Sequence, residues 1–194
     1  KNFIKRDNVA LVLGDNVFYG PSFSKVLSNA KKRQTGATIF SFPVKDPKRF
    51  GVLEIGKNNK VISIVEKPNN PKSNLIATGL YFYDNKVIDI VKKLKPSKRG
   101  ELEITDVNIK YLNENKLFVE HLGREFSWLD TGTSETLLAA NNFVNLTQRR
   151  QGSQIACIEE IALKKKWIVK KNIENRLRKL TKGLYSDYLR KLIK

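Results

Sequence analysis

The stretch Phe126-Ser127-Trp128-Leu129-Asp130-Thr131-Gly132-Thr133 joins an apolar run, a carboxylate and a Thr-Gly-Thr turn. Residues 134–146 follow with apolar side chains at helical spacing, so the turn is predicted to open a helix. Asp130 then ends a strand or loop, which is where α/β folds place ligand-binding groups. The helical side chains that we expect to face a core are Leu137, Leu138, Ala140 and Val144.

A second carboxylate has the same setting far earlier in the chain. Residues 9–13 form an apolar run typical of a buried strand, and Gly14-Asp15-Asn16 follows at once. Two acids at two strand ends can converge on one hard cation, and Mg²⁺ binds one or two carboxylates together with substrate phosphates. From spacing alone, each Asp could instead shape a turn or cap a helix.

Composition indicates an ordinary globular protein. The chain has 194 residues, 40% hydrophobic and 29% charged, which suits one domain with a sizeable core. No apolar run approaches the roughly 20 residues of a membrane span, and no signal-peptide pattern opens the chain, so no membrane partner is expected. The single Cys157 cannot form an internal disulfide, which favours a reducing compartment such as the cytoplasm.

The net charge of +18 raises the hypothesis of a nucleic-acid binder. The charge is uneven, because the tail from Lys164 to Lys194 holds twelve basic and two acidic residues. Base-reading proteins tend to use Arg forks and aromatic platforms, and neither is clustered here. We therefore predict no nucleic-acid partner.

Strands and helices alternate up to residue 150, which predicts an α/β fold. The expected strands cover residues 9–13, 37–44, 51–55, 61–65, 76–83 and 117–122, and the expected helices 22–33, 87–94 and 104–113. After residue 150 the pattern is helical, at residues 158–165, 173–180 and 185–192. We divide the chain into a core at 1–150 and a basic helical appendage at 151–194, whose apolar residues should dock on the core or another subunit.

Five short motifs follow one another along the chain. They are Leu13-Gly14-Asp15-Asn16-Val17-Phe18-Tyr19-Gly20, Val65-Glu66-Lys67-Pro68, Thr78-Gly79-Leu80-Tyr81-Phe82-Tyr83-Asp84, Arg99-Gly100-Glu101-Leu102-Glu103-Ile104-Thr105-Asp106 and Trp128-Leu129-Asp130-Thr131-Gly132-Thr133. In order and spacing they resemble the glucose-1-phosphate thymidylyltransferases, a sugar nucleotidyltransferase family. Gln151-Gly152 and the run from Cys157 to Ala162 extend the resemblance over nearly the whole chain.

The resemblance implies a Rossmann-like mixed-sheet core and a Mg²⁺-dependent enzyme. Its reaction would transfer a thymidylyl group from dTTP to glucose 1-phosphate, giving dTDP-glucose and pyrophosphate. The attacking phosphate is already an anion, because its second pKa is about 6, so no general base is needed. Catalysis can then rest on positioning and charge neutralisation. The family also implies a homo-oligomer, a tetramer.

The resemblance also implies roles for single residues. Asp15 and Asp130 would hold the metal, and Lys67 and Arg99 would be the phosphate cations. Glu66 and Glu101 would accept hydrogen bonds from sugar hydroxyls. The remaining substrate-binding residues would be Asn16, Gly51, Gly79, Tyr81 and Trp128. Without the resemblance, Lys67 could be a solvated loop residue, and Arg99-Gly100-Glu101 a surface turn with an ion pair.

The chain departs from the family pattern at several positions. Phe50 stands where the family usually has Tyr, so a hydroxyl near the sugar is lost. Pro21 and Lys164 replace a usual His and Arg near a regulatory nucleotide site formed with Arg124, so end-product inhibition is not carried over.

The family's N-terminal segment, with a Gly-rich loop that cradles the triphosphate, has no counterpart here. The sequence also lacks Met, even at position 1, so we expect a fragment or a trimmed product with little activity alone. The alternatives are a catalytically silent sugar-phosphate-binding or assembly fragment, and a related uridylyltransferase.

Overall fold

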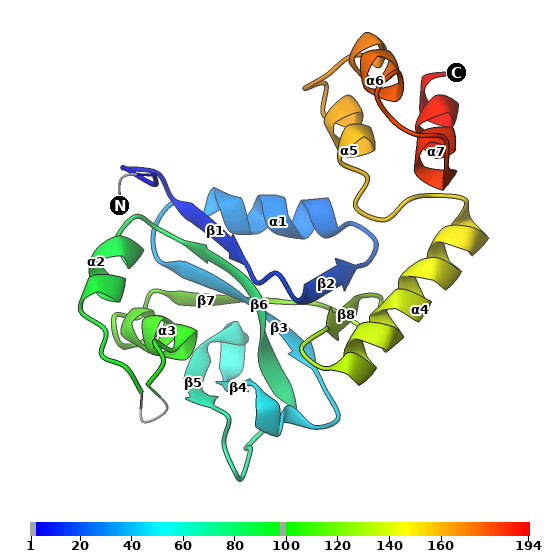
Figure 1. Cartoon of the computed structure of the whole chain (residues 1–194). Helices are drawn as coiled ribbons and strands as arrows, with labels where there is room; N and C mark the ends of the chain where they lie inside the picture. The colour runs from blue at the N-terminus through cyan, green and yellow to red at the C-terminus, as the bar shows by residue number, and fades with distance from the viewer. Residues whose placement is uncertain (1–2, 98–99) are drawn as a thin grey trace. The chain divides into compact units, whose positions relative to one another are not determined.

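The computed structural model describes residues 3–97 and 100–194. The chain divides by its contacts into two compact units, Lys1–Gly132 and Thr133–Lys194. The boundary expected at residue 150 lies one helix later than this division. Each unit is described by itself below (Figure 1).

A mixed β-sheet forms the centre of the first unit. Its strands are β1 (Val9–Val12), β3 (Ala37–Pro43), β4 (Gly51–Ile55), β5 (Val61–Glu66), β6 (Leu75–Tyr83) and β7 (Leu117–His121). They are ordered β5-β4-β6-β3-β7, with β1 paired to β6. The pairing of β3 with β7 is parallel and the other pairings are antiparallel. This arrangement confirms the predicted α/β class with a mixed sheet.

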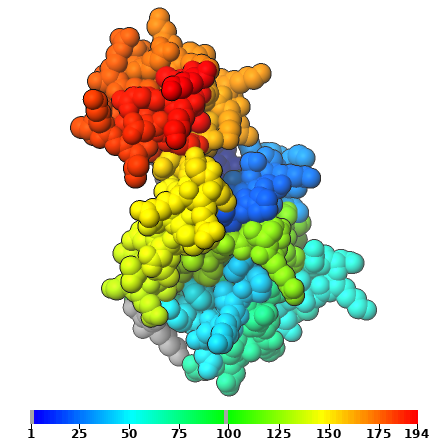
Figure 2. All heavy atoms as spheres, turned by 90° about the vertical axis from the view of Figure 1, so that its right-hand side faces the viewer, coloured from blue at the N-terminus to red at the C-terminus, as the bar shows by residue number. Residues whose placement is uncertain are grey.

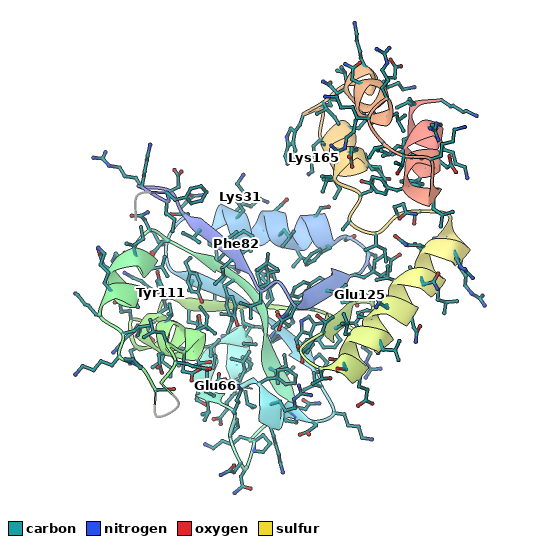
Figure 3. All side chains as sticks on the ribbon, in the orientation of Figure 1. Lys31, Glu66, Phe82, Tyr111, Glu125 and Lys165 are labelled. Atoms are coloured by element: carbon teal, nitrogen blue, oxygen red, sulfur yellow. The ribbon has the colours of Figure 1, made fainter. Side chains whose placement is uncertain are left out.

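Helices cover both faces of this sheet because its strands carry large apolar side chains on both. Ile39, Tyr81 and Tyr83 belong to the cluster that includes α2 (Val87–Lys92) and α3 (Ile104–Asn113). The alternate residues Phe40, Leu80 and Phe82 belong to the cluster that includes α1 (Phe23–Lys32). Strand side chains alternate between faces, so each strand contributes to both layers. Figure 3 shows Tyr111 on the α3 side and Lys31 on α1.

A small second sheet was not predicted from the sequence. The strand β2 (Asn16–Tyr19) pairs antiparallel with β8 (Ser127–Asp130), in the register Asn16↔Asp130 to Tyr19↔Ser127. All eight residues are partly buried, so β2 has no alternation of apolar and polar side chains that would mark it as a strand. Its partner also lies more than a hundred residues away, beyond the reach of any local pattern.

The burial predicted for residues 9–13 is wrong. They form β1 as expected, but Ala10, Leu11 and Val12 are exposed, Val12 at 58%. The strand pairs with β6 alone among the described strands. The Leu13 amide donates to the Gly79 carbonyl (2.8 Å), so by antiparallel alternation the backbone groups of Ala10 and Val12 point away from β6. Val9–Val12 is therefore an open edge of the sheet.

The second unit is helical throughout, as predicted. It contains α4 (Ser134–Gln151), α5 (Ile158–Lys164), α6 (Lys170–Leu177) and α7 (Leu184–Ile193). Cys157, Ile173 and Leu189 form the buried centre, and Leu177 and Leu180 pack against it. These apolar residues pack within their own unit, which explains their spacing, so the prediction that they dock on the core or another subunit is wrong. Figure 2 shows the orange and red atoms of α5 to α7 gathered into one body.

The face expected for α4 is also wrong in part. Ala140 is buried, whereas Leu137 and Leu138 are 49% and 61% exposed. The helix begins as the sequence predicts, with Thr133 accepting a hydrogen bond from the Thr136 amide (3.2 Å). None of the described helices combines the length and apolar character that crossing a membrane requires.

Candidate active site

A cavity of about 270 Å³ in the first unit gathers most of the predicted site residues. Nine of them line it: Asp15, Asn16, Gly51, Glu66, Lys67, Gly79, Tyr81, Trp128 and Asp130. They come from the two-stranded sheet and the residue before it, from the start of β4, from the end of β5 and the residue after it, and from residues 79 and 81 within β6. Residues widely separated in sequence therefore share one concave surface, the usual form of a small-molecule site.

Asp15 and Asp130 come together, as the sequence predicted. Asp130 is the register partner of Asn16, and Asp15 immediately precedes this pair. The Thr131 amide and hydroxyl both donate to the Asp15 carbonyl, at 2.8 and 3.0 Å. Within the described residues no group of three or more His, Cys, Asp or Glu residues forms a dedicated metal cage. Two carboxylates are nevertheless a suitable donor set for Mg²⁺ that also binds substrate phosphates.

Asn16 fixes the geometry between the two sheets. Its Oδ1 accepts hydrogen bonds from the Gly79 amide (2.9 Å) and the Trp128 indole Nε1 (2.7 Å). Its Nδ2 donates to Asp15 Oδ1 (2.8 Å), which orients that carboxylate. A Cβ atom on residue 79 would lie 2.7 Å from three atoms of the Asn16 side chain. Residue 79 is therefore Gly because any larger side chain would clash with the Asn16 side chain.

Glu66, at the end of β5, is held by a residue that the sequence did not single out. The Thr105 hydroxyl, at the start of α3, donates to Glu66 Oε2 (2.5 Å). A Cβ on Gly51 would lie 3.1 Å from Thr105 Oγ1 and 3.4 Å from Glu66 Oε2. The second carboxylate oxygen, Oε1, lies 3.9 Å from Lys67 Nζ. Figure 3 shows Glu66 near the lower edge of the sheet.

Lys67 has a strained backbone. Its φ of 43° lies in the left-handed region, which L-residues rarely adopt. The following residue, Pro68, restricts it further toward extended conformations. Its amide donates to the Phe50 carbonyl (3.0 Å), which holds Lys67 beside β4. The surrounding structure must hold this conformation in place, and Lys67 lines the cavity.

Arg49 and Phe50 form one wall of the cavity. An Arg49 guanidinium nitrogen lies 3.6 Å from Asp130 Oδ2. The Phe50 ring meets the Trp128 ring edge to face, with centroids 5.3 Å apart. Phe50 thus supplies packing where the resemblance expects a hydroxyl. Arg49 was not predicted as a site residue, and only its contact with Asp130 distinguishes it.

Tyr81 lies on the cavity side of β6. Burial, helped by the nearby Glu66 carboxylate, raises the pKa of its hydroxyl well above the ordinary value. The hydroxyl therefore stays protonated at neutral pH and can donate a hydrogen bond.

The sequence profile of the nucleotidyl transferase family matches residues 1–147. The chain belongs to this family. A glucose-1-phosphate thymidylyltransferase of Neisseria gonorrhoeae is 51% identical over 193 residues, which cover all of this chain and 67% of the relative. One from Mycobacterium tuberculosis is 47% identical over 192 residues, 99% of this chain and 66% of the relative. The chain thus spans about two thirds of the length of these curated relatives.

Solved structures agree with the fold of this nucleotidyl transferase. A Bacillus anthracis protein assigned as a glucose-1-phosphate thymidylyltransferase, in complex with sucrose, matches with a TM-score of 0.64 and 42% identity. The match covers 73% of this chain and 56% of that one. An apo UDP-glucose pyrophosphorylase matches with a TM-score of 0.67 at 21% identity, which speaks for the fold alone. The family resemblance and the enzyme class predicted from the sequence are both confirmed.

Three described site residues that were predicted for this nucleotidyl transferase, Glu101, Arg124 and Lys164, do not line the cavity. Arg99 lies outside the described residues, and Glu101 is exposed. Arg124 is exposed between β7 and β8, in the first unit. Lys164 belongs to the second unit, where it pairs with Glu160 (2.5 Å). Since the regulatory residues are divided between two separately described units, that site stays a prediction.

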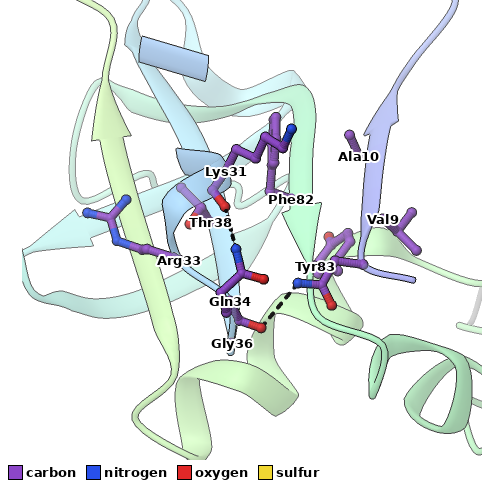
Figure 4. A pocket seen from close by; sticks show the side chains of 10 residues that line it. Val9, Ala10, Lys31, Arg33, Gln34, Gly36, Thr38, Phe82 and Tyr83 are labelled. Atoms are coloured by element: carbon purple, nitrogen blue, oxygen red, sulfur yellow. Dashed lines mark hydrogen bonds between the residues drawn. The ribbon is translucent and has the colours of Figure 1, made fainter. Parts of the chain in front are cut away.

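A second hollow of about 230 Å³ lies beside β1 (Figure 4). Its rim is held by hydrogen bonds from Asn8 Nδ2 to the Gln34 carbonyl (3.1 Å) and from Gln34 Nε2 to the Lys31 carbonyl (3.2 Å). None of its lining residues is acidic, and none was predicted as a site residue. It therefore lacks the chemistry of the carboxylate-lined cavity.

Proposed function

We propose that this nucleotidyl transferase transfers a thymidylyl group from dTTP to glucose 1-phosphate, giving dTDP-glucose and pyrophosphate. The observation that carries the proposal is the convergence of Asp15, Asp130, Glu66 and Lys67 on one cavity. The names of the similar curated proteins support the same substrates. A uridylyltransferase is the nearest alternative, because the described cavity contains no group that we can assign to base recognition.

The phosphate of the sugar is the nucleophile and attacks the α-phosphorus of dTTP as pyrophosphate leaves. Its charge at neutral pH means that the protein need not remove a proton. Lys67 would place a point charge on this phosphate, and Arg99 would add a planar fork. Asp15 and Asp130 would hold Mg²⁺, which supplies charge neutralisation when bound. Positioning of the two reactants is then the main contribution of the chain.

The sugar would lie against β4, β5 and β6. Glu66, fixed by Thr105, presents carboxylate oxygens that can accept from sugar hydroxyls. The Tyr81 hydroxyl can donate to a sugar oxygen, and Glu101 would be a second acceptor. Gly51 leaves space above Glu66 that a side chain would fill. Trp128 offers an aromatic surface whose indole nitrogen is already committed to Asn16.

We further propose a cytoplasmic homo-oligomer, a tetramer by analogy with the family, without nucleic-acid or membrane partners. Large apolar side chains exposed on the second unit support association of subunits, among them Trp167 at 74% and Leu184 at 86%. Sedimentation of the purified protein measures the oligomeric state, and salt-resistant retention on DNA would contradict the exclusion of nucleic acid.

The proposal is tested by binding and turnover of the 194-residue chain. Glucose 1-phosphate binding is measured by calorimetry, and pyrophosphate release is measured with dTTP and with UTP. Release that prefers dTTP supports the thymidylyl assignment, and release that prefers UTP supports the alternative. Binding without release in this chain, and also after fusion to a relative's N-terminal segment, would indicate a silent sugar-phosphate-binding module.

Asp130→Asn tests the metal ligand directly. The variant removes one carboxylate charge but keeps an oxygen that can accept from the Gly132 amide (3.1 Å), so its melting temperature should change little. Binding of Mn²⁺, used as a probe for Mg²⁺, should weaken at least about tenfold because a charged ligand is lost. In a catalytically active form of the enzyme, the variant should lose roughly several kcal/mol of transition-state stabilisation, and its turnover should slow accordingly. Unchanged Mn²⁺ affinity would refute the assignment.

A further inference from the structure

The backbone of Arg49 is fixed by the turn in which it lies, whereas its guanidinium is only weakly held. Arg49 ends the short 3₁₀ turn Pro47–Arg49, in which Asp46 Oδ1 accepts from the Lys48 amide (3.3 Å) and the Phe50 amide donates to the Pro47 carbonyl (3.1 Å). These hydrogen bonds fix the turn, and Arg49 at its end lines the cavity. The guanidinium lies 3.6 Å from Asp130 Oδ2, and its side chain is 53% exposed.

The contact with Asp130 is a weak ion pair. At 3.6 Å it is longer than a hydrogen bond, and it joins one guanidinium nitrogen to one oxygen rather than two to two. Partly exposed pairs of this kind contribute little to stability. The guanidinium also lies 5.9 Å from the centre of the Phe50 ring, a stacking contact that tolerates movement of this group.

We propose that Arg49 is a substrate-binding residue that exchanges partners. Without ligands it neutralises Asp130, and when a divalent cation occupies Asp130 it turns to the phosphate of the sugar. This inference rests on the proposed function, since it names a further cation for the same substrate.

Two physical arguments support the exchange. A metal ion and a guanidinium repel each other at one carboxylate, so metal binding releases Arg49. Arg49 and Lys67 line the same cavity, and Arg binds phosphate through a planar fork that Lys lacks. The exchange would also make metal and sugar phosphate bind cooperatively, because each removes the competitor of the other.

The alternative is that Arg49 forms only a surface ion pair. The two cases differ in the effect that removal of Arg49 has on glucose 1-phosphate binding. If Arg49 exchanges partners, its removal should strengthen metal binding to the free protein and weaken glucose 1-phosphate binding. A plain ion pair, or general loss of one positive charge, gives no strong effect on the sugar phosphate.

The test compares Arg49→Gln with Lys48→Gln. Both variants lose one positive charge at neighbouring positions, and Lys48 is exposed and does not line the cavity. Mn²⁺ affinity is measured by electron paramagnetic resonance without sugar phosphate, and glucose 1-phosphate affinity by calorimetry. Arg49→Lys, which keeps the charge but not the fork, is measured alongside, with thermal melts to establish folding.

We expect R49Q to bind Mn²⁺ about two- to fivefold more tightly and glucose 1-phosphate about tenfold more weakly than K48Q. R49K should lie between wild type and R49Q for the sugar phosphate. Equal values for R49Q and K48Q, with glucose 1-phosphate bound by the wild-type chain, would overturn the role of Arg49 alone. No binding of glucose 1-phosphate by the wild-type chain would instead refute the proposed function.

Discussion

At the scale of single residues, the cavity contains side chains that were predicted from the sequence and two, Thr105 and Arg49, that were not. Asp15 and Asp130 follow apolar runs, and Lys67 precedes a proline, so each stands in a recognisable local setting. Thr105 and Arg49 have no such setting, and only their contacts with Glu66 and Asp130 distinguish them. The roles predicted for Asp15, Asp130 and Lys67 come from the family resemblance rather than from local pattern, whereas the support that Thr105 gives to Glu66 depends on the fold.

The strain at Lys67 leads to a prediction about stability. Left-handed backbone costs an L-residue roughly 1–2 kcal/mol that Gly avoids, and the flexibility of unfolded Gly returns about 0.5–1 kcal/mol. Lys67→Gly should therefore be up to about 1 kcal/mol more stable than Lys67→Met, while both lose glucose 1-phosphate affinity to the same extent. Urea unfolding and calorimetry measure the two quantities, and a more stable K67M would show that residue 67 is unstrained.

At the scale of elements, the strands and helices expected from the sequence are present, with ends shifted by a few residues. Gly51–Ile55 and Ile104–Asn113 agree with the expected bounds, because turn residues or caps mark their ends. The missed strand is β2, whose side chains are all partly buried and whose partner is β8. Its existence depends on a pairing across the chain, which is also what joins Asp15 to Asp130. Local pattern thus predicted the helices and the strands of the main sheet, but not the pairing of β2 with β8 that brings Asp15 beside Asp130.

The contact between the two sheets can be tested with Asn16 and Gly79. Gly79→Ala should destabilise the chain by about 1–3 kcal/mol, since the new methyl group overlaps the Asn16 side chain. Asn16→Ala should cost a similar amount, about 1–3 kcal/mol, because the Gly79 amide and the Trp128 indole lose their acceptor.

In the double variant the overlap disappears, so the two effects should fall short of additivity by about 1 kcal/mol or more. Denaturant melts of the four proteins give this coupling energy. Strictly additive effects would mean that Asn16 moves freely away from Gly79.

At the scale of the whole molecule, the stability of the second unit depends on two charged carboxylates, Glu159 and Glu160. In the second unit, burial alone would raise the pKa of Glu159, but hydrogen bonds from Tyr185 and Arg176 outweigh it and the pKa is lowered. Burial is likewise outweighed at Glu160, where Lys164 and the Tyr188 hydroxyl (2.7 Å) lower the pKa. Both carboxylates therefore stabilise the folded helices in their charged form.

A lowered folded pKa contributes stability above the unfolded value of 4.5 that is lost as pH falls through the folded value. The second unit should therefore be less stable at pH 3 than at pH 7. Hydrogen exchange resolved by segment should show faster exchange in α5 to α7 at pH 3 after correction for intrinsic rates. Glu159→Gln should be less stable than wild type at pH 7 and less sensitive to acid, and an unchanged acid sensitivity would contradict the role of Glu159.

The open edge of β1 has a consequence for handling the protein. Backbone groups at Ala10 and Val12 that have no partner among the described residues can template a neighbouring extended chain, but the +18 net charge keeps molecules apart in dilute buffer. The range of that repulsion shrinks from about 10 Å at 0.1 M salt to about 3 Å at 1 M. The protein should therefore aggregate faster as the salt concentration rises, and light scattering should increase over hours. Val12→Lys, which places a charge on the edge strand, should suppress this increase. Scattering that falls with added salt would instead mean that attraction between opposite charges, not the strand edge, governs colloidal behaviour.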